Sequence, residues 1–218
     1  MPKCHQLALA AALLLSCAPV TVVARSAAPD LHRVGNRLMD KTTGEVVHLK
    51  GMAMMGGEYS CVHGQSVFAG PADISVVEGM AKWGINAIRL PMNEDCWLGL
   101  HGVDAKYSGK AYQDRFVEFT ELLLSHGFVV VLDLHWTNST GGLALGQDFL
   151  MSRDSPRFWA SVAAHPALKS RPGVVFELFN EPHQGEVRET LFGVTFICFW
   201  KNPIILPRQA RDNHRKTS

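Results

Sequence analysis

Four apolar segments, each followed by polar residues, constrain the fold of this chain most strongly. They are residues 46–50, 85–90, 128–134 and 174–179. The third, FVVVLDL, is almost continuously apolar, which is typical of a strand buried on both faces in a parallel sheet. The segments start roughly 40 residues apart, the length of a strand, a helix and two loops. The pattern therefore predicts repeated βα units.

Helix-type spacing fills the intervals between these strands. Apolar residues recur at helical spacing in 72–83 and 112–126, and the two segments stop at Gly84 and Gly127, as helices often do. A shorter helix is expected at 156–164. Strands that alternate with helices predict an α/β domain with a parallel sheet.

Two parallel-sheet architectures fit this order of elements. A doubly wound dinucleotide-binding sheet needs a glycine-rich turn after its first strand, but KGMAMMGGEY at 50–59 has its glycines at other spacings. Polar residues follow the strands instead, at the end where a (β/α)8 barrel carries its active site. They are Glu58, Arg89, Asp133, His135, Asn180 and Glu181. The barrel is therefore the predicted fold.

The number of βα units is smaller than a complete barrel requires. A complete barrel takes about 250 residues and about eight strands, whereas this 218-residue chain shows four such units. After residue 190 the pattern is lost, so 191–218 is expected to be a divergent tail outside the fold. A divergent fifth strand is the alternative. We predict a barrel truncated to about its first four βα units.

The composition is that of one globular domain. The chain is 47% hydrophobic and 19% charged, and its formal net charge is +1. This charge gives no electrostatic reason to expect a nucleic-acid partner.

The first 24 residues have the features of a secretory signal peptide. Lys3 and His5 precede the apolar run 7–15, and small residues lead to an expected cleavage site after Ala24. The run is too short for a membrane span, which needs about 20 apolar residues. A bacterial lipoprotein site at Cys17 fits only in part and is a minor alternative. We expect residues 25–190 to form the exported partial barrel, with no membrane attachment after cleavage.

Export would place the remaining cysteines in an oxidising compartment. Cys61 and Cys96 are then the natural disulfide pair, and Cys198 has no evident partner within the chain. The alternative is that Cys61 and Cys96 are two buried free thiols.

Several motifs, in order and at barrel-unit spacing, resemble the N-terminal half of glycoside hydrolase family 5, the cellulase-type enzymes. They are GNRLMDKTTGEVVHLKGM, INAIRLPMNEDCWLG, VVLDLHW and VFELFNEP, and the likeness covers roughly residues 35–183. The resemblance implies a barrel of glycosidase type and a polysaccharide substrate, with no cofactor and no metal.

The motif Asn180-Glu181-Pro182 carries the chemistry that the resemblance implies. Glu181 matches the acid/base residue of the family, which must be protonated when the substrate binds. Asn180 matches the residue that donates to the sugar 2-hydroxyl. On the residues alone, Glu181 could also be a solvated or capping carboxylate, and Asn180 a turn residue before proline.

Three further residues match positions that bind substrate or the second carboxylate. Arg89 matches the arginine that keeps the nucleophile ionised, with a structural ion pair to Glu177 or Asp133 as the alternative. His135 and Trp136 match residues that line the sugar site, although either could simply be packed in the core. Strand parity places these two on opposite faces, so only one is expected to point inward unless the strand has ended, and His135 is preferred.

The family nucleophile has no counterpart among the predicted units. In retaining enzymes of this type it is a glutamate on the seventh strand. The other acids of the chain lack its sequence context, namely Glu58, Glu94, Asp95, Asp133 and Glu177.

The expected function is therefore a secreted glycosidase that hydrolyses β-linked glucan by a retaining two-carboxylate mechanism, inactive or weakly active as this chain. The alternative is a non-catalytic carbohydrate-binding or decoy protein. A metal-dependent hydrolase using Asp133, His135 and Glu181 is least favoured, because only one histidine lies at a strand end.

Overall fold

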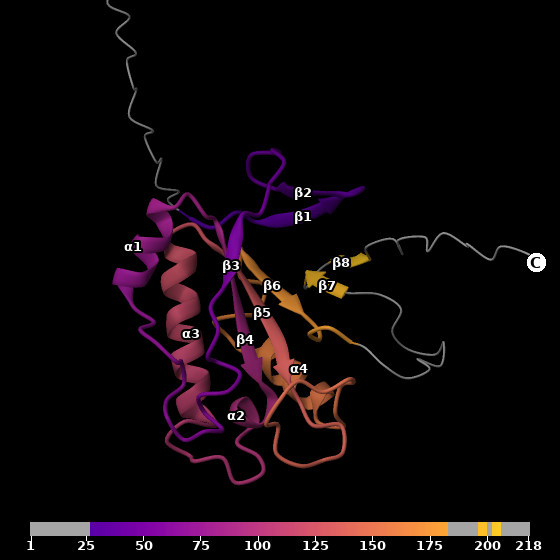
Figure 1. Ribbon diagram of the computed structural model, residues 1–218. Helices are drawn as coiled ribbons and strands as arrows, with labels where there is room; N and C mark the ends of the chain where they lie inside the picture. The colour runs from indigo at the N-terminus through magenta and orange to yellow at the C-terminus, as the bar shows by residue number, and fades with distance from the viewer. Residues whose placement is uncertain (1–26, 183–195, 200–201, 206–218) are drawn as a thin grey trace, which may run out of the picture.

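The parallel sheet organises the part of the chain that the computed structural model describes, residues 27–182, 196–199 and 202–205. Four of its strands are parallel and adjacent in chain order (Figure 1). They are β3 (Gly51–Ala53), β4 (Ala87–Asn93), β5 (Val129–Trp136) and β6 (Val174–Glu177). Two more strands, β7 (Phe196–Phe199) and β8 (Asn202–Ile205), continue the sheet in antiparallel order.

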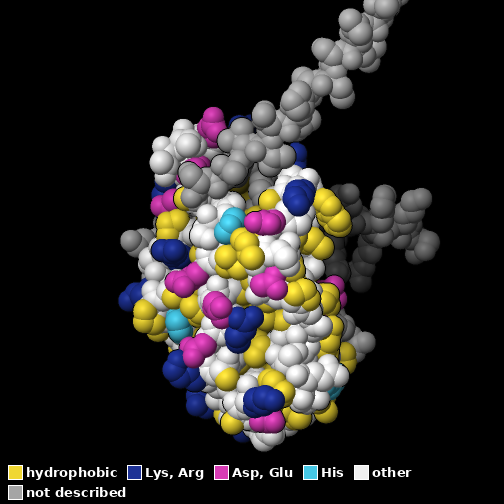
Figure 2. All heavy atoms as spheres, turned by 90° about the vertical axis from the view of Figure 1, so that its left-hand side faces the viewer, with side chains coloured by type: hydrophobic (Ala, Val, Ile, Leu, Met, Phe, Trp, Pro, Cys, Tyr) yellow, Lys and Arg dark blue, Asp and Glu magenta, His cyan; other side chains and the backbone are white. Residues whose placement is uncertain are grey.

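Helices cover one face of the parallel sheet. Three of them follow strands as predicted, α1 (Ile74–Lys82), α3 (Lys110–Ser125) and α4 (Ser155–Ala164). Their apolar sides pack on alternate strand residues such as Ile88, Val130 and Val174 to form the larger core. Figure 2, which views the molecule from the side of α1 and α3, shows acidic and basic side chains interspersed over this surface.

The opposite face, which we call the site face, is apolar at one end only. There the hairpin of β1 (Leu31–Val34) and β2 (Arg37–Asp40) lies beside the sheet (Figure 1). Leu31 packs with Ala87, Val129 and Val175 in a second, smaller cluster. Because side chains alternate between faces, Arg89 and Asp133 lie on this same face, further toward the carboxyl ends of the strands.

The fold prediction is confirmed. Strands and helices alternate, the sheet is parallel, and four βα-type strands match about the first four units of a (β/α)8 barrel. The three predicted helices are present, with ends shifted by a few residues. The short helix α2 (Glu94–Leu98) directly after β4 was not predicted.

The predicted first strand at 46–50 is wrong. Val46 forms only an isolated antiparallel bridge to Met39, so this segment extends the hairpin, and the first parallel strand is β3. Gly51 opens β3 and lies close to β4, since a Cβ there would lie 2.2 Å from the carbonyl oxygen of Ala87. Only glycine allows the two strands to approach this closely.

The predicted disulfide between Cys61 and Cys96 is confirmed, with an S–S distance of 1.99 Å. It joins the loop after β3 to α2. Closing a chain segment of 35 residues is worth about 4 kcal/mol in the chain-entropy view. The bond therefore fixes the loop after β3 to α2 at the carboxyl end of the sheet.

The predicted signal peptide, residues 1–24, lies outside the described residues, as does most of the predicted tail. Within the described part of the chain, no helix combines the length and apolar character that crossing a membrane requires.

Candidate functional site

Polar side chains from three adjacent strands meet on the site face where the strands end. Asp133 of β5 is the register partner of Glu177 at the end of β6. Arg89 of β4 pairs in register with Val131, two residues before Asp133. Because register partners in a sheet point to the same side, the parallel pairing itself brings these three charges together.

Arg89 is the centre of this group. Its Nε and Nη2 atoms donate to the two carboxylate oxygens of Glu177 at 2.7 and 2.8 Å. Nη2 also donates to Oδ1 of Asn180 at 2.7 Å and lies 3.0 Å from Oδ2 of Asp133. Bidentate pairing of this kind is the strongest form of arginine–carboxylate contact. The structural ion pair considered from the sequence is therefore present.

The charges around Arg89 control its ionisation. Burial acts to lower the pKa of Arg89, but hydrogen bonding to Glu177 and the charges of Asp133, Glu177 and Glu181 outweigh it, so the pKa is raised. Arg89 is therefore a permanent cation in the site.

Asp133 is the most deeply buried acid of the group. Its side chain is 0% exposed, and burial raises its pKa to about 6, although the hydrogen bond to His135 and the charge of Arg89 act against this rise. Its Oδ2 atom lies 2.6 Å from Nδ1 of His135. Asp133 thus joins Arg89 to the predicted sugar-binding histidine.

β5 is irregular at His135 and Trp136, so strict alternation of side chains between faces does not apply to these two residues. Met92 pairs with Leu134 but Asn93 pairs with Trp136, so His135 is an extra residue, a bulge. A bulge changes the direction of the side chains that follow it. His135 bonds Asp133, and the ring of Trp136 lies 6.2 Å from that of Tyr59 in the loop after β3. The two predicted residues therefore need not occupy opposite faces.

Asn180 is buried and held on several sides. Its backbone N–H donates to the carbonyl of Leu134, and its Oδ1 accepts from Arg89. Its Nδ2 donates to Oε1 of Gln147, whose Nε2 donates back to the carbonyl of Asn180 at 2.7 Å. One Nδ2 hydrogen remains for another acceptor, because an amide nitrogen carries two. Sequence reasoning missed Gln147, which lies in an aperiodic loop and carries no motif.

Glu181 follows Asn180 at the edge of this group. The strand ends at Glu177, earlier than the sequence suggested, and Glu181 is exposed, with φ of +40°. A non-glycine residue with positive φ costs of the order of 1 kcal/mol or more and is often found at functional sites. Its charge contributes to the raised pKa of Arg89, so the carboxylate and the guanidinium are electrostatically coupled.

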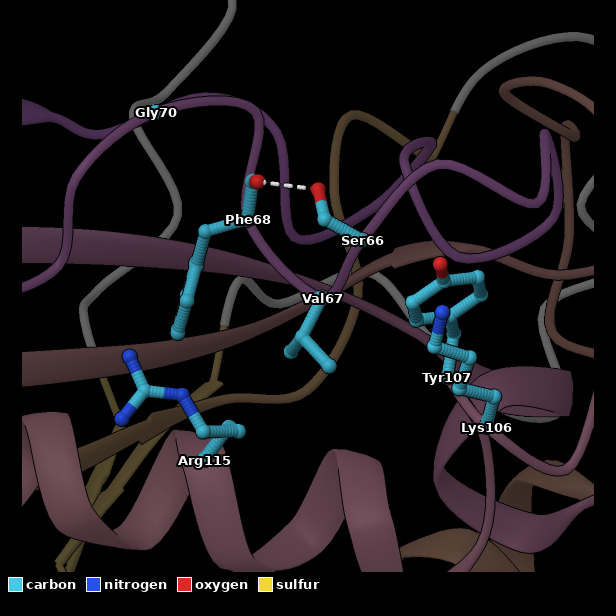
Figure 3. Close-up of a pocket in the computed structure, with 7 residues that line it drawn as sticks. All are labelled: Ser66, Val67, Phe68, Gly70, Lys106, Tyr107 and Arg115. Carbon is cyan, nitrogen blue, oxygen red and sulfur yellow. Dashed lines mark hydrogen bonds between the residues drawn. The ribbon is translucent and has the colours of Figure 1, made fainter.

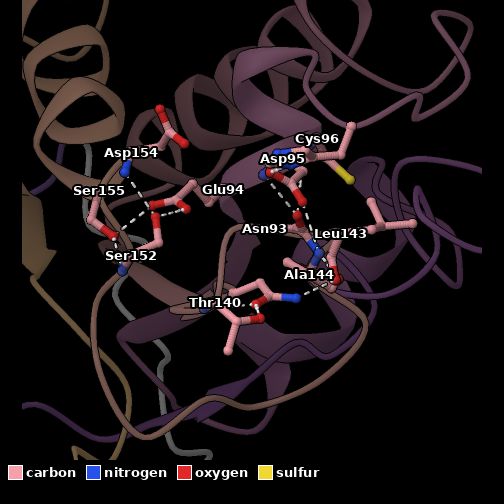
Figure 4. A network of polar contacts seen from close by, with 12 residues as sticks. Asn93, Glu94, Asp95, Cys96, Thr140, Leu143, Ala144, Ser152, Asp154 and Ser155 are labelled. Atoms are coloured by element: carbon pink, nitrogen blue, oxygen red, sulfur yellow. Dashed lines mark hydrogen bonds and ion pairs between the residues drawn. The ribbon is translucent and has the colours of Figure 1, made fainter.

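The other acids at this end of the sheet hold loops in place, and Figure 4 shows the contacts of Glu94 and Asp95. Oε2 of Glu94 accepts from the Ser155 hydroxyl at 2.5 Å, and burial raises the pKa of Glu94. Asp95 accepts from the Ala144 backbone at 2.7 Å and binds His101. Oε2 of Glu58 accepts from the Gly56 backbone at 2.8 Å.

A separate pocket of about 310 Å³ lies between the loop after β3 and helix α3 (Figure 3). It contains none of the predicted site residues. Its two cations already have contacts, since Arg115 pairs with Glu118 and the Lys106 ammonium lies 5.1 Å from the centre of the Tyr107 ring.

Among residues 27–182 and the two short described segments, no group of three or more His, Cys, Asp or Glu side chains could hold a metal ion. Asp133, His135 and Glu181 therefore do not form such a group.

Three solved structures with a similar backbone are described as a cellulase, an endocellulase and a β-mannanase. They include a cellulase–inhibitor complex, with 22% identity, a TM-score of 0.48, and coverage of 70% of this chain and 42% of that one. An endocellulase from Pyrococcus horikoshii bound to cellotetraose has 21% identity, a TM-score of 0.49, and coverage of 75% and 46%. A β-mannanase from Thermomonospora fusca has 14% identity, a TM-score of 0.44, and coverage of 72% and 43%. The chain spans less than half the length of each.

A search of curated protein sequences found no match. The family comparison is more informative, because residues 40–201 match the family described as cellulase, glycosyl hydrolase family 5. This match covers most of the chain and includes β4, β5 and β6 with the charged group at their ends. The chain belongs to glycosyl hydrolase family 5.

Proposed function

We propose that this chain provides the sugar-binding and acid/base part of a secreted glycosidase that acts on a β-linked glucan such as cellulose. The observation that carries the proposal is the arrangement of Arg89, His135 and Asn180 around the carboxylates of Asp133 and Glu177. Asn180 directly precedes Glu181. Family membership supports glycosidase chemistry, while the glucan substrate and the secreted location rest on the sequence motifs and the predicted signal peptide.

In this mechanism Glu181 protonates the oxygen of the leaving sugar and later activates water. Asn180, whose amide is oriented by Arg89 and Gln147, uses its second N–H for the sugar 2-hydroxyl. That bond strengthens as the oxocarbenium-like transition state forms. Trp136 and His135 contact the pyranose ring through an apolar face and a hydrogen bond.

A retaining glycosidase also requires a carboxylate nucleophile on the opposite side of the scissile bond, about 5 Å from the acid/base carboxyl group. The family places it on a seventh strand, beyond the four units of this sequence. We therefore propose that these four units by themselves bind glucan but cleave it weakly or not at all.

The first test is calorimetric titration of the full chain with cellotetraose and, in parallel, with mannotetraose, followed by chromatography of the sugars. We expect cellotetraose to bind without cleavage, and His135→Ala to weaken binding at least tenfold. The matched control is His126→Ala, which changes an exposed histidine at the C-cap of α3.

Two results would count against the proposal. If the folded protein binds neither tetrasaccharide, there is no sugar site at His135. If the wild type cleaves cellotetraose and Glu181→Gln does not, the four units need no further carboxylate for catalysis.

A further inference from the structure

Asp133 lies where it can determine the protonation pattern of His135. Its side chain is completely buried, and its Oδ2 atom is shared between Nδ1 of His135 at 2.6 Å and Nη2 of Arg89 at 3.0 Å. Its other oxygen, Oδ1, is buried without a hydrogen-bond partner among the described residues. The orientation of this carboxylate is thus set by the two nitrogen atoms on one side.

The shared oxygen must act as an acceptor. Arg89 carries hydrogens on all its guanidinium nitrogens and has no lone pair to offer. A proton on Oδ2 would therefore face the Arg89 cation, so Oδ2 stays unprotonated and accepts from His135, whose Nδ1 carries the hydrogen. In a neutral imidazole the other nitrogen, Nε2, then holds the lone pair.

The His135 ring leaves that lone pair available. In the described part of the chain the ring makes its hydrogen bond through Nδ1, and the side chain is 13% exposed. The neighbouring groups Arg89 and Asn180 are donors through their N–H groups. An acceptor next to donors suits a sugar hydroxyl, which can give one hydrogen bond and receive another.

We propose that Asp133 is a positioning residue that fixes His135 in the Nδ1–H tautomer, so that Nε2 accepts a hydrogen bond from a sugar hydroxyl. The ligand part of this inference rests on the proposed function, whereas the tautomer part does not. The same logic, in which a carboxylate orients an imidazole by its second nitrogen, applies in metal sites and catalytic triads.

The tautomer can be measured directly by ¹⁵N NMR of the full chain labelled at histidine, at a pH where the ring is neutral. His135→Gln assigns the signal. We expect a protonated Nδ1 and an unprotonated Nε2 in the wild type. In Asp133→Ala, which removes the acceptor, we expect a mixture of tautomers, and in Asp133→Asn, whose carbonyl can still accept, we expect the wild-type pattern.

An Nε2–H tautomer in the wild type would overturn the inference, and so would an unchanged pattern in folded Asp133→Ala. If Asp133→Ala does not fold, the tautomer measured in the wild type alone tests the inference. Adding cellotetraose separates this inference from the proposed function. A shift of the Nε2 signal with Nδ1–H retained supports both, whereas the correct tautomer without any response to sugar counts against the sugar site alone.

Discussion

Gln147 holds Asn180 by two hydrogen bonds, one to its side chain and one to its backbone. The Asn180 Nδ2 donates to Gln147 Oε1, and the Gln147 Nε2 donates to the Asn180 carbonyl at 2.7 Å. With Arg89 on the amide oxygen, the orientation of Asn180 is set from both ends. The loop after β5 therefore positions the residue next to the proposed catalytic acid.

Replacing Gln147 by alanine should disturb both stability and sugar binding. It leaves two polar groups of buried Asn180 without their partner, which we expect to lower the free energy of unfolding by about 1–2 kcal/mol. Cellotetraose binding should weaken in parallel. Urea denaturation and calorimetry measure the two effects, with Gln65→Ala at an exposed loop residue as the control. Equal free energies of unfolding and equal cellotetraose binding in the two variants would show that Gln147 does not position Asn180.

Removing the Arg89 charge should destabilise the fold strongly. Arg89→Ala leaves Asp133 and Glu177 without their cation, and breaking such a pair costs about 3–5 kcal/mol. Arg89→Lys keeps the charge but not the two-pronged contact, so an intermediate loss is expected. Arg115→Ala is the matched control, because its pair with Glu118 is exposed and should contribute about 0–1 kcal/mol. Similar losses for Arg89→Ala and Arg115→Ala would contradict this ranking.

The buried Asp133 should make stability depend on pH. Its folded pKa is about 6, above the value of about 3.9 for an unfolded Asp. The folded chain binds this proton more tightly, so the stabilising contribution is full below about pH 4 and is lost as the pH rises through about 6. We expect Asp133→Asn to remove this decrease in the free energy of unfolding with rising pH, which is at most roughly 3 kcal/mol.

Urea denaturation at several pH values between about 4 and 7 measures that slope. The comparison is with Asp114→Asn, an exposed aspartate paired with Lys110. The slope due to buried Glu94, whose pKa is also raised, remains in both variants. An Asp133→Asn slope equal to that of Asp114→Asn would show that Asp133 does not titrate in this range.

Replacing two glycines by alanine should change the stability of the fold in opposite directions. At Gly57 a Cβ would lie 2.4 Å from the Pro91 carbonyl oxygen and 2.5 Å from the Phe116 ring, whereas at Gly79 in α1 it would meet nothing within 4 Å. Gly57→Ala should therefore destabilise the fold by about 1–3 kcal/mol, and Gly79→Ala should stabilise it by up to about 1 kcal/mol. Thermal unfolding distinguishes the two signs, and a loss of stability in both would contradict the prediction.

Features that depend on local pattern were predictable. The helices α1 and α3 follow from apolar spacing and glycine ends, α4 from a shorter segment, and β4 and β5 from near-continuous apolar runs. The motifs around Arg89, His135 and Asn180 were sufficient to indicate the family. Local spacing reports which residues will be buried, because helices and strands have fixed periods.

The first strand and the bulge were not predictable in this way. Residues 46–50 have a strand-like composition, but they extend the hairpin instead of entering the parallel sheet, and β3 follows them. The bulge at His135 depends on the pairing of β5 with β4. Strand pairing and bulge position depend on which neighbouring strand forms the hydrogen bonds, and a single segment of sequence does not contain that information.

The sequence by itself determined that polar groups would gather at the carboxyl ends of parallel strands, and which residue types they would be. Only the tertiary structure decided how they pair. Arg89 meets Glu177 and Asn180, which are 88 and 91 positions away, and Gln147 meets Asn180 across 33 positions. These contacts depend on strand register and on the paths of loops, which have no repeating pattern and are set by packing of the whole domain.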